Sequence, residues 1–239
     1  MPAFVNLAAI GATSFRSDRL GPLDSVAHPL KPGDYAGEVW RGDDRVGTFT
    51  IEVDDDGDGE QIEVDLCAVG KPGFDKPRFR GGSLDAAPVY AVFHCEGERT
   101  SLHVVLRDRR NRDSLFDSRA LQPGDYYIVT VARPGQWKMK SGRATGVLVV
   151  QQATPSAKPR ASASGAMIRI DGAKFDPDRA EIVSGDGAVF EITGKDIQIA
   201  LKLAVERRQA GKQKVGVRYF GRDGAAAADG RGRNDRDPR

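Results

Sequence analysis

The sequence predicts a soluble, mainly β protein: an antiparallel β-sandwich followed by a small C-terminal α+β unit. Between residues 35 and 150, apolar and polar residues alternate in short runs, as in strands with one buried face. Turn-forming residues separate these runs, and many short antiparallel strands indicate a sandwich. Residues 151–166 are rich in Ala, Ser and Pro without periodicity, which predicts a linker between the two units.

The two ends of the chain are predicted to lie outside these units. Residues 1–34 are expected to be an N-terminal extended segment, and residues 167–220 form the smaller unit. Residues 221–239 contain no large apolar side chain, so they cannot bury enough surface to offset the entropy of ordering. We therefore expect a disordered C-terminal tail.

Two hairpins are predicted within the sandwich. Residues 48–53 and 61–66 each place three apolar side chains on one face, and the acidic, glycine-containing stretch 54–60 between them is typical of a turn. Residues 89–95 and 101–107 repeat this arrangement around a short polar loop. Three more strands are expected at residues 126–132, 136–140 and 145–150.

The C-terminal unit combines two periodicities. After Asp196, a good N-cap residue, Ile197 and Leu201 recur at helical spacing, so a helix is predicted over about residues 196–210. A closing strand is expected at residues 215–220. The other strands of this unit are predicted at residues 168–170, 180–183 and 188–193.

One six-residue pattern occurs twice. Residues 30–35 read Leu-Lys-Pro-Gly-Asp-Tyr, and residues 121–126 read Leu-Gln-Pro-Gly-Asp-Tyr. In each copy Pro favours a turn, Gly permits a positive φ and Tyr opens a strand. Shared strand-entry chemistry is a sufficient explanation, and an internal duplication is the alternative.

Charge and hydropathy exclude two broad classes of function. The 36 Lys and Arg nearly balance the 34 Asp and Glu, so a net charge of +2 does not make the whole chain a nucleic-acid binder. No apolar run approaches the ~20 residues of a membrane-spanning helix. The mildly apolar start has no basic flank and is interrupted by Asn6, which makes a poor secretory signal and favours a cytoplasmic location.

Cys67 and Cys95 are the two cysteines of the chain. Neither lies in a Cys-x-x-Cys pair or at a metal-ligand spacing. Because the cytoplasm keeps thiols reduced, we expect two free, partly buried thiols, with a single disulfide as the alternative.

An acidic stretch offers a candidate calcium site, and no other cofactor is expected. Acidic residues alternate here, a glycine follows at the sharp bend, and Asp65 stands at the closing position of a calcium-binding loop. The flanks are predicted strands rather than helices, so a solvated acidic turn is the competing interpretation. The candidate ligands are Asp54, Asp56, Asp58, Glu60 and Asp65.

The sequence contains no catalytic constellation that we recognise, and we interpret the protein as non-enzymatic. Nucleophilic catalysis needs Ser or Cys beside a positioned base, and phosphate binding needs a glycine loop that opens a helix. His94 and His103 are predicted to share one face of the second hairpin, but two ligands do not make a zinc site. His28, before Pro29 in a predicted loop, has no predicted partner.

A cluster of basic residues surrounds the predicted helix end and the last strand. Such a cluster can contact phosphates. The helix dipole also favours cations at a helix C-terminus, and acidic residues dilute the charge of the tail, so nucleic acid is not the expected partner. The cluster consists of Arg207, Arg208, Lys212, Lys214 and Arg218.

Three segments of the first unit resemble the bacterial pre-peptidase C-terminal domain. They are residues 35–53, which begin Tyr-Ala-Gly-Glu-Val-Trp, residues 106–109, Leu-Arg-Asp-Arg, and residues 121–129, which begin Leu-Gln-Pro-Gly-Asp-Tyr. This resemblance covers roughly residues 35–135. It implies a jelly-roll-like sandwich that is non-catalytic, is appended to secreted enzymes and sometimes binds calcium.

Two further resemblances are shorter. Residues 57–66 and 135–140 are similar to stretches of the tellurium-resistance domain family, which implies a cytoplasmic, calcium-binding β-sandwich. Residues 175–178 and 183–186 are similar to the early strands of cupredoxins. Copper requires His and Cys ligands, and residues 166–239 contain neither, so no copper site is expected there.

These observations favour a non-enzymatic binding or assembly module that acts through protein–protein contacts or self-association. A calcium-responsive sandwich protein is the first alternative, and an enzyme with an unrecognised site is the second.

Overall fold

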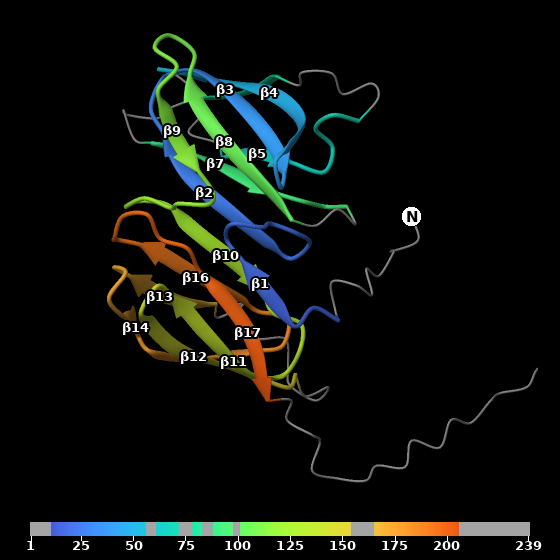
Figure 1. The fold of residues 1–239 in the computed structure, drawn as a ribbon, viewed down its shortest axis with the longest axis vertical. Coiled ribbons are helices and arrows are strands. Elements are labelled where there is room, and N and C mark those ends of the chain that lie inside the picture. The colour runs from blue at the N-terminus through green and yellow to red at the C-terminus, as the bar shows by residue number, and fades with distance from the viewer. Residues whose placement is uncertain are drawn as a thin grey trace, which may run out of the picture. The chain divides into compact units, whose positions relative to one another are not determined.

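The computed structural model describes residues 11–55, 61–71, 78–82, 88–97, 101–153 and 165–205 (Figure 1). These residues form seventeen β-strands and no helix, which confirms the prediction of a mainly β protein. Nothing in these ranges could cross a membrane as a helix.

The strands form three sheets, which we call sheets A, B and C. In spatial order, sheet A contains β1 (Ser14–Arg16), β17 (Ala200–Val205), β11 (Gly135–Ser141), β12 (Ala144–Gln151) and β15 (Arg179–Val183). Sheet B contains β6 (Arg78–Gly82), β4 (Asp44–Asp54), β3 (Gly33–Arg41), β8 (Leu102–Asp108) and β9 (Ser114–Asp117). Sheet C contains β14 (Phe175–Asp176), β13 (Ala166–Ile170), β16 (Gly187–Ile192), β10 (Tyr126–Thr130), β2 (Asp24–Leu30), β7 (Val89–His94) and β5 (Ile62–Asp65).

Sheet C is a layer shared by two halves of the structure, one formed with sheet B and the other with sheet A. One face of sheet C is buried across its whole width. Six residues in register across six neighbouring strands have no exposed surface. A row of this length means that one face of the sheet supplies a continuous core. In spatial order the row is Ile168, Phe190, Tyr127, Val26, Phe93 and Val64.

Sheets B and A pack on different halves of this face. Phe93 of β7 contacts two aromatic rings of sheet B, Phe49 at 6.0 Å and Phe116 at 5.5 Å between ring centroids. In the other half, a Cβ on Gly146 of β12 would lie 3.3 Å from the ring of Phe175 in β14, so sheet A approaches sheet C there. The structure therefore has two halves of two layers each, sheet B on sheet C and sheet A on sheet C. The halves meet where β2 pairs with β10.

Both predicted hairpins are wrong, although their strands are present. β4 lies in sheet B, whereas β5 lies in sheet C and pairs in parallel with β7. Likewise β7 lies in sheet C and β8 in sheet B. Alternation determines which face of a strand is buried but not which strand lies beside it. In both cases the chain passes from one layer to the other between consecutive strands.

The predicted helix over residues 196–210 is wrong where the structure describes it, because residues 200–205 form β17. Ile197, Ile199 and Leu201 are all buried, which is a period of two rather than a helical one. Asp196 has a φ of 54°, and its carboxylate accepts a hydrogen bond from Gln122 instead of capping a helix. Residues 206–210, the predicted strand at 215–220 and the predicted tail lie outside the described residues.

Strands on the two sides of the predicted linker share sheets. β12 pairs with β15 over residues 147–151, and β10 pairs with β16 over residues 126–130. The described residues accordingly belong to one compact unit, and the predicted separate C-terminal α+β unit is not seen among them. The predicted N-terminal extended segment contributes β1 to sheet A and the interior strand β2 to sheet C. The remaining predicted strands, at 126–132, 136–140, 145–150, 168–170, 180–183 and 188–193, are confirmed as β10, β11, β12, β13, β15 and β16.

We predict that Gly37→Ala lowers the free energy of unfolding by about 1–3 kcal/mol, because overpacking a dense core forces side chains to shift. Gly37 pairs directly with Phe49, and a Cβ on Gly37 would lie 2.1 Å from the Phe49 ring. Gly187→Ala is the matched control, since the nearest atom to its Cβ is 4.0 Å away. Urea unfolding of both variants tests this prediction. Equal midpoints would contradict the close contact of the Phe49 ring with Gly37.

Candidate functional sites

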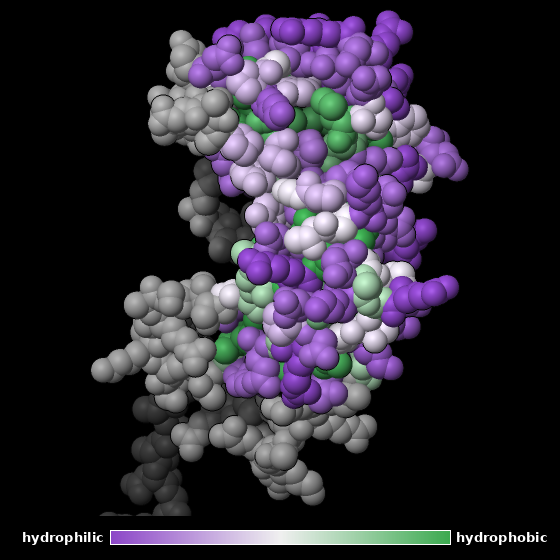
Figure 2. Space-filling view, turned by 90° about the vertical axis from the view of Figure 1, so that its left-hand side faces the viewer, coloured by the Kyte–Doolittle hydropathy of each residue, from purple (hydrophilic) through white to green (hydrophobic). Residues whose placement is uncertain are grey.

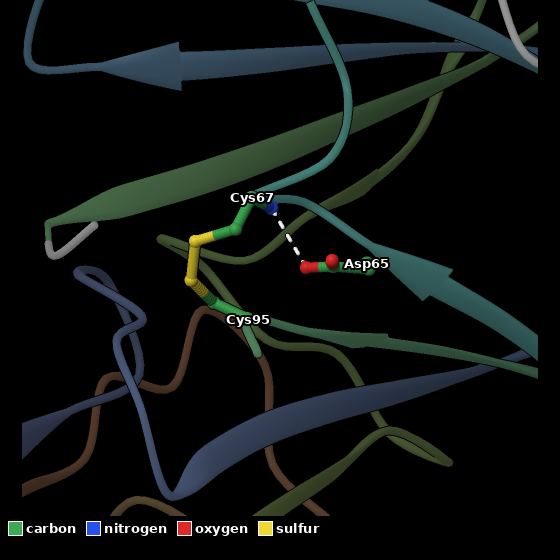
Figure 3. Close-up of side chains that lie close together, drawn as sticks. All are labelled: Asp65, Cys67 and Cys95. Carbon is green, nitrogen blue, oxygen red and sulfur yellow. Dashed lines mark hydrogen bonds between the residues drawn. A yellow bond between two sulfur atoms is a disulfide. The ribbon is translucent and has the colours of Figure 1, made fainter. Parts of the chain in front are cut away.

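The two cysteines are joined, so the prediction of free thiols is wrong. Cys67 follows β5 and Cys95 follows β7, and a disulfide connects them with 5.0 Å between their Cα atoms (Figure 3). Because β5 and β7 are paired in parallel, their ends lie together and bring the two cysteines into range. The sequence separation of 28 residues gave no sign of this pairing.

Asp65 organises the backbone around the disulfide. Its Oδ1 accepts a hydrogen bond from the backbone N–H of Cys67 at 2.9 Å (Figure 3). The same oxygen accepts a second one from the backbone N–H of Glu96 at 3.2 Å. The carboxylate therefore holds the residues that follow the two paired strands. Asp65, Cys67 and Cys95 form a group at the spacing of metal ligands, but both sulfur atoms belong to the disulfide. Among the residues described, this is the one such group of three.

The structure describes two of the five candidate calcium ligands, Asp54 and Asp65. Asp54 is exposed at the end of β4, where it lines a hollow of about 340 Å³ together with Asp34, Glu52 and Arg110. Asp65 lies at the far end of β5 in another sheet, engaged with backbone N–H groups. Asp56, Asp58 and Glu60 lie outside the described residues, so the calcium site stays a prediction.

The histidines are not arranged as predicted. His94 lies in sheet C and His103 in sheet B, so they do not share a hairpin face. His103 stacks on Trp40 at 6.2 Å between ring centroids, and burial lowers its pKa. The residues of the predicted basic cluster, Arg207, Arg208, Lys212, Lys214 and Arg218, lie outside the part of the chain that the structure describes.

A pair that the sequence did not suggest lies where the two halves meet. His28 is in β2 rather than in a loop, and its Nδ1 donates to Asp125 Oδ1 at 2.6 Å. The side chain of Asp125 is 1% exposed, and its other oxygen accepts a hydrogen bond from the backbone N–H of Gln122. His28 also packs on Phe116 of sheet B. One imidazole thus links β2, the turn before β10 and sheet B.

A second polar pair is buried beside it. Asp24 in β2 accepts hydrogen bonds from the hydroxyl of Tyr127 in β10 at 3.1 Å and from the backbone N–H of Gly21 at 2.6 Å. Burial raises the pKa of Asp24 to about 7, and burial also raises the pKa of Tyr127. Asp24 shares the period-two face of the buried Val26 and Leu30, and a polar residue at this inward position was the signal available in the sequence.

Comparison with known proteins assigns neither a family nor a function to the chain. The chain matches no family model, no curated protein and no solved structure. The resemblances to pre-peptidase C-terminal, tellurium-resistance and cupredoxin domains therefore stay predictions.

We predict that removing the disulfide by Cys67→Ser and Cys95→Ser lowers the free energy of unfolding by about 3 kcal/mol, from the entropy of closing a loop of this length. Thermal melts with and without reductant test this prediction. Reductant should lower the melting temperature of the native chain and leave that of the double variant unchanged. A native chain that titrates with thiol reagents after non-reducing denaturation would contradict the disulfide.

We predict that Asp24 makes the protein less stable as pH rises. Its pKa is near 7 when folded and about 3.9 when unfolded, so the favourable contribution is complete below pH 4 and is lost as pH rises through 7. Asn does not ionise, and it can accept from the Gly21 N–H through its carbonyl oxygen while its NH2 group donates to the hydroxyl oxygen of Tyr127. Relative to the native chain, Asp24→Asn should therefore gain about 2–3 kcal/mol between pH 5 and pH 8. Urea unfolding at both pH values measures this, and parallel pH profiles would contradict it.

Proposed function

We propose that this chain is a non-enzymatic binding module that contacts proteins through the outer face of sheet C. The observation that supports it most directly is a cluster of partly exposed apolar and aromatic side chains on that face. We call it the outer-face cluster. It consists of Tyr90, Val92, Tyr126, Ile128, Met167 and Val189.

The cluster is continuous across both halves of the unit. Register pairs join Met167 to Val189 and Val189 to Ile128, so one row crosses β13, β16 and β10. The ring of Tyr126 in β10 contacts the ring of Tyr90 in β7 at 5.6 Å between centroids, with β2 between the two strands. Burial raises the pKa of Tyr90.

Its composition is that of a protein-binding surface. Tyr and Met are enriched at interfaces because they bury a large area while the phenol can still hydrogen-bond. Met167 is 55% exposed, which is unusual for a large apolar side chain in a strand. Arg169 and Glu191 form an ion pair of 2.8 Å beside the cluster, and this gives it a charged rim. Figure 2 shows one face of the molecule, where hydrophobic patches lie between hydrophilic residues.

The side chains best suited to chemistry are engaged in structural contacts, which supports a non-enzymatic role. Cys67 and Cys95 form the disulfide, and Asp65 holds the adjoining backbone. The buried pairs Asp24–Tyr127 and His28–Asp125 hold β2 to β10 and to the turn before it.

Sheet edges are less suited to partner binding than this face. The six edge strands have two to five residues each, and short edges offer few unpaired backbone groups. Two edges also carry charged pairs, Arg78 with Glu52 at β6 and Arg179 with Glu181 at β15. Charge on an edge strand opposes strand addition.

The disulfide supports a place in an oxidising compartment rather than the cytoplasm expected from the sequence. Disulfides persist outside the cell, in the periplasm and in the secretory pathway, and they are reduced in most cytoplasms. The finer description as a jelly-roll-like sandwich is likewise a proposal, supported by the two-layer packing of each half.

We predict that the outer-face cluster mediates self-association, because two copies that meet through this face would bury its exposed apolar row. Light scattering after size exclusion should show the mass rising with concentration, and Met167→Lys should abolish that rise because it places a charge in the apolar row. Leu115→Lys is the matched control, because Leu115 is 38% exposed but lies on β9 of sheet B. If both variants lost the concentration-dependent rise in mass, self-association could not be assigned to the outer-face cluster.

A further inference from the structure

Sheet A has an outer face of quite different character. Lys138 and Lys140 alternate with buried residues along β11, so both point away from the core. Lys202 of β17 is the direct cross-strand partner of Lys138, so its side chain projects on the same face. All three lysines are exposed. Their Cβ atoms are separated by about 5 Å across strands and about 7 Å along β11.

This arrangement is unfavourable in the protein alone. Like charges directly opposite each other in a sheet destabilise the pair. Some exposed Arg side chains elsewhere on the described surface are paired with carboxylates, as in Arg78–Glu52 and Arg119–Asp117. None of the three lysines forms an ion pair with a described residue. A bound anion would relieve the repulsion that the fold leaves in place.

A groove runs beside these lysines. It encloses about 630 Å³ between β11, β12 and the start of β15. Val147 pairs with Lys138 on one side and with Arg179 on the other, so a cationic side chain flanks the apolar floor on each side. The lining residues are Lys138, Met139, Lys140, Thr145, Gly146, Val147, Asp178 and Arg179.

We propose that this groove binds an acidic polysaccharide, a chain of sugars that carries carboxylate or sulfate groups. The proposal is independent of the outer-face cluster, which lies on the opposite layer. Cationic side chains on both sides of the groove match a ligand with regularly spaced negative charges. The volume is that of a site for a ligand of several rings rather than for a single ion.

Two features of the lining favour a sugar polymer over a nucleic acid. Asp178 lies among the cations, where its carboxylate can accept hydrogen bonds from the hydroxyl groups that a sugar polymer carries on every ring. Single-stranded nucleic acid is bound by stacking bases on aromatic side chains, and the lining contains no aromatic residue. Trp137, in the same strand, is fully buried on the inner face.

The test is calorimetric titration with polygalacturonate at low salt. The triple variant Lys138→Gln, Lys140→Gln and Lys202→Gln should weaken binding by at least about tenfold, because the charges that hold the polymer are removed. The matched control is Lys31→Gln, Lys174→Gln and Lys195→Gln, which removes the same charge from exposed lysines elsewhere and should leave affinity within about twofold. Equal melting temperatures of the two variants show that both are folded.

Three outcomes would overturn the inference. One is no binding of polygalacturonate by the native chain, and another is equal loss in both triple variants. The third is tighter binding of poly(dT) through the same lysines, which would assign the groove to nucleic acid. Met167→Lys should bind a galacturonate oligomer that is too short to bridge two copies with the same affinity as the native chain, so a failure of the protein-contact proposal is distinguishable from a failure of this one.

Discussion

The pairing of β2 with β10 is the constraint on which the rest of the fold depends. It joins the strands that pack on sheet B to the strands that pack on sheet A, and so makes sheet C a single sheet. Polar contacts add to its backbone bonds on the buried side, from Tyr127 to Asp24 and from His28 to Asp125. Buried polar pairs stabilise less than apolar packing, but they fix one register because any slip leaves them unpaired. A shift of the β2–β10 register by one residue would separate Tyr127 from Asp24 and His28 from Asp125.

Much of the strand content could be predicted from the sequence, because alternation reports which side chains face a core. The neighbours could not be predicted, since Phe49 and Phe93 alternate equally well in a hairpin and in two facing sheets. The C-terminal strand was missed because residues 197–205 fit two periods. Ile197 and Leu201 are four apart as in a helix, and Ile199 between them completes a period of two. The pairing of β17 with β1 and β11, which buries Leu201 on one face and leaves Lys202 exposed on the other, decided between the two patterns.

The repeated six-residue pattern is used differently at its two positions. Tyr35 of the first copy is buried, and its hydroxyl donates to the carbonyl of Lys31 within the same turn. In the second copy Tyr126 faces outward, while Asp125 closes the turn through Gln122 and accepts from His28. Gly124 has a φ of 95°, which explains glycine at that point of the turn. The same local chemistry therefore starts two strands without placing its polar groups alike.

The candidate sites show the same limit of sequence reasoning. Lys138 and Lys140 could be assigned to an exposed face from their alternation with Trp137 and Met139. Only the register with β17 shows that Lys202 stands directly opposite Lys138. Cys67 and Cys95 likewise meet because β5 pairs in parallel with β7, which no spacing in the chain indicates.

The outer faces of sheets A and C can bind different partners at the same time. Sheets A and C pack through their inner faces, so the lysines of sheet A and the outer-face cluster of sheet C point in opposite directions. Copies that associated through sheet C would keep every lysine row exposed. A polymer with repeated charges can then engage several copies at once, and each further contact is effectively intramolecular. Weak individual contacts of exposed lysines, which are worth little singly, would in that way add up to stable attachment.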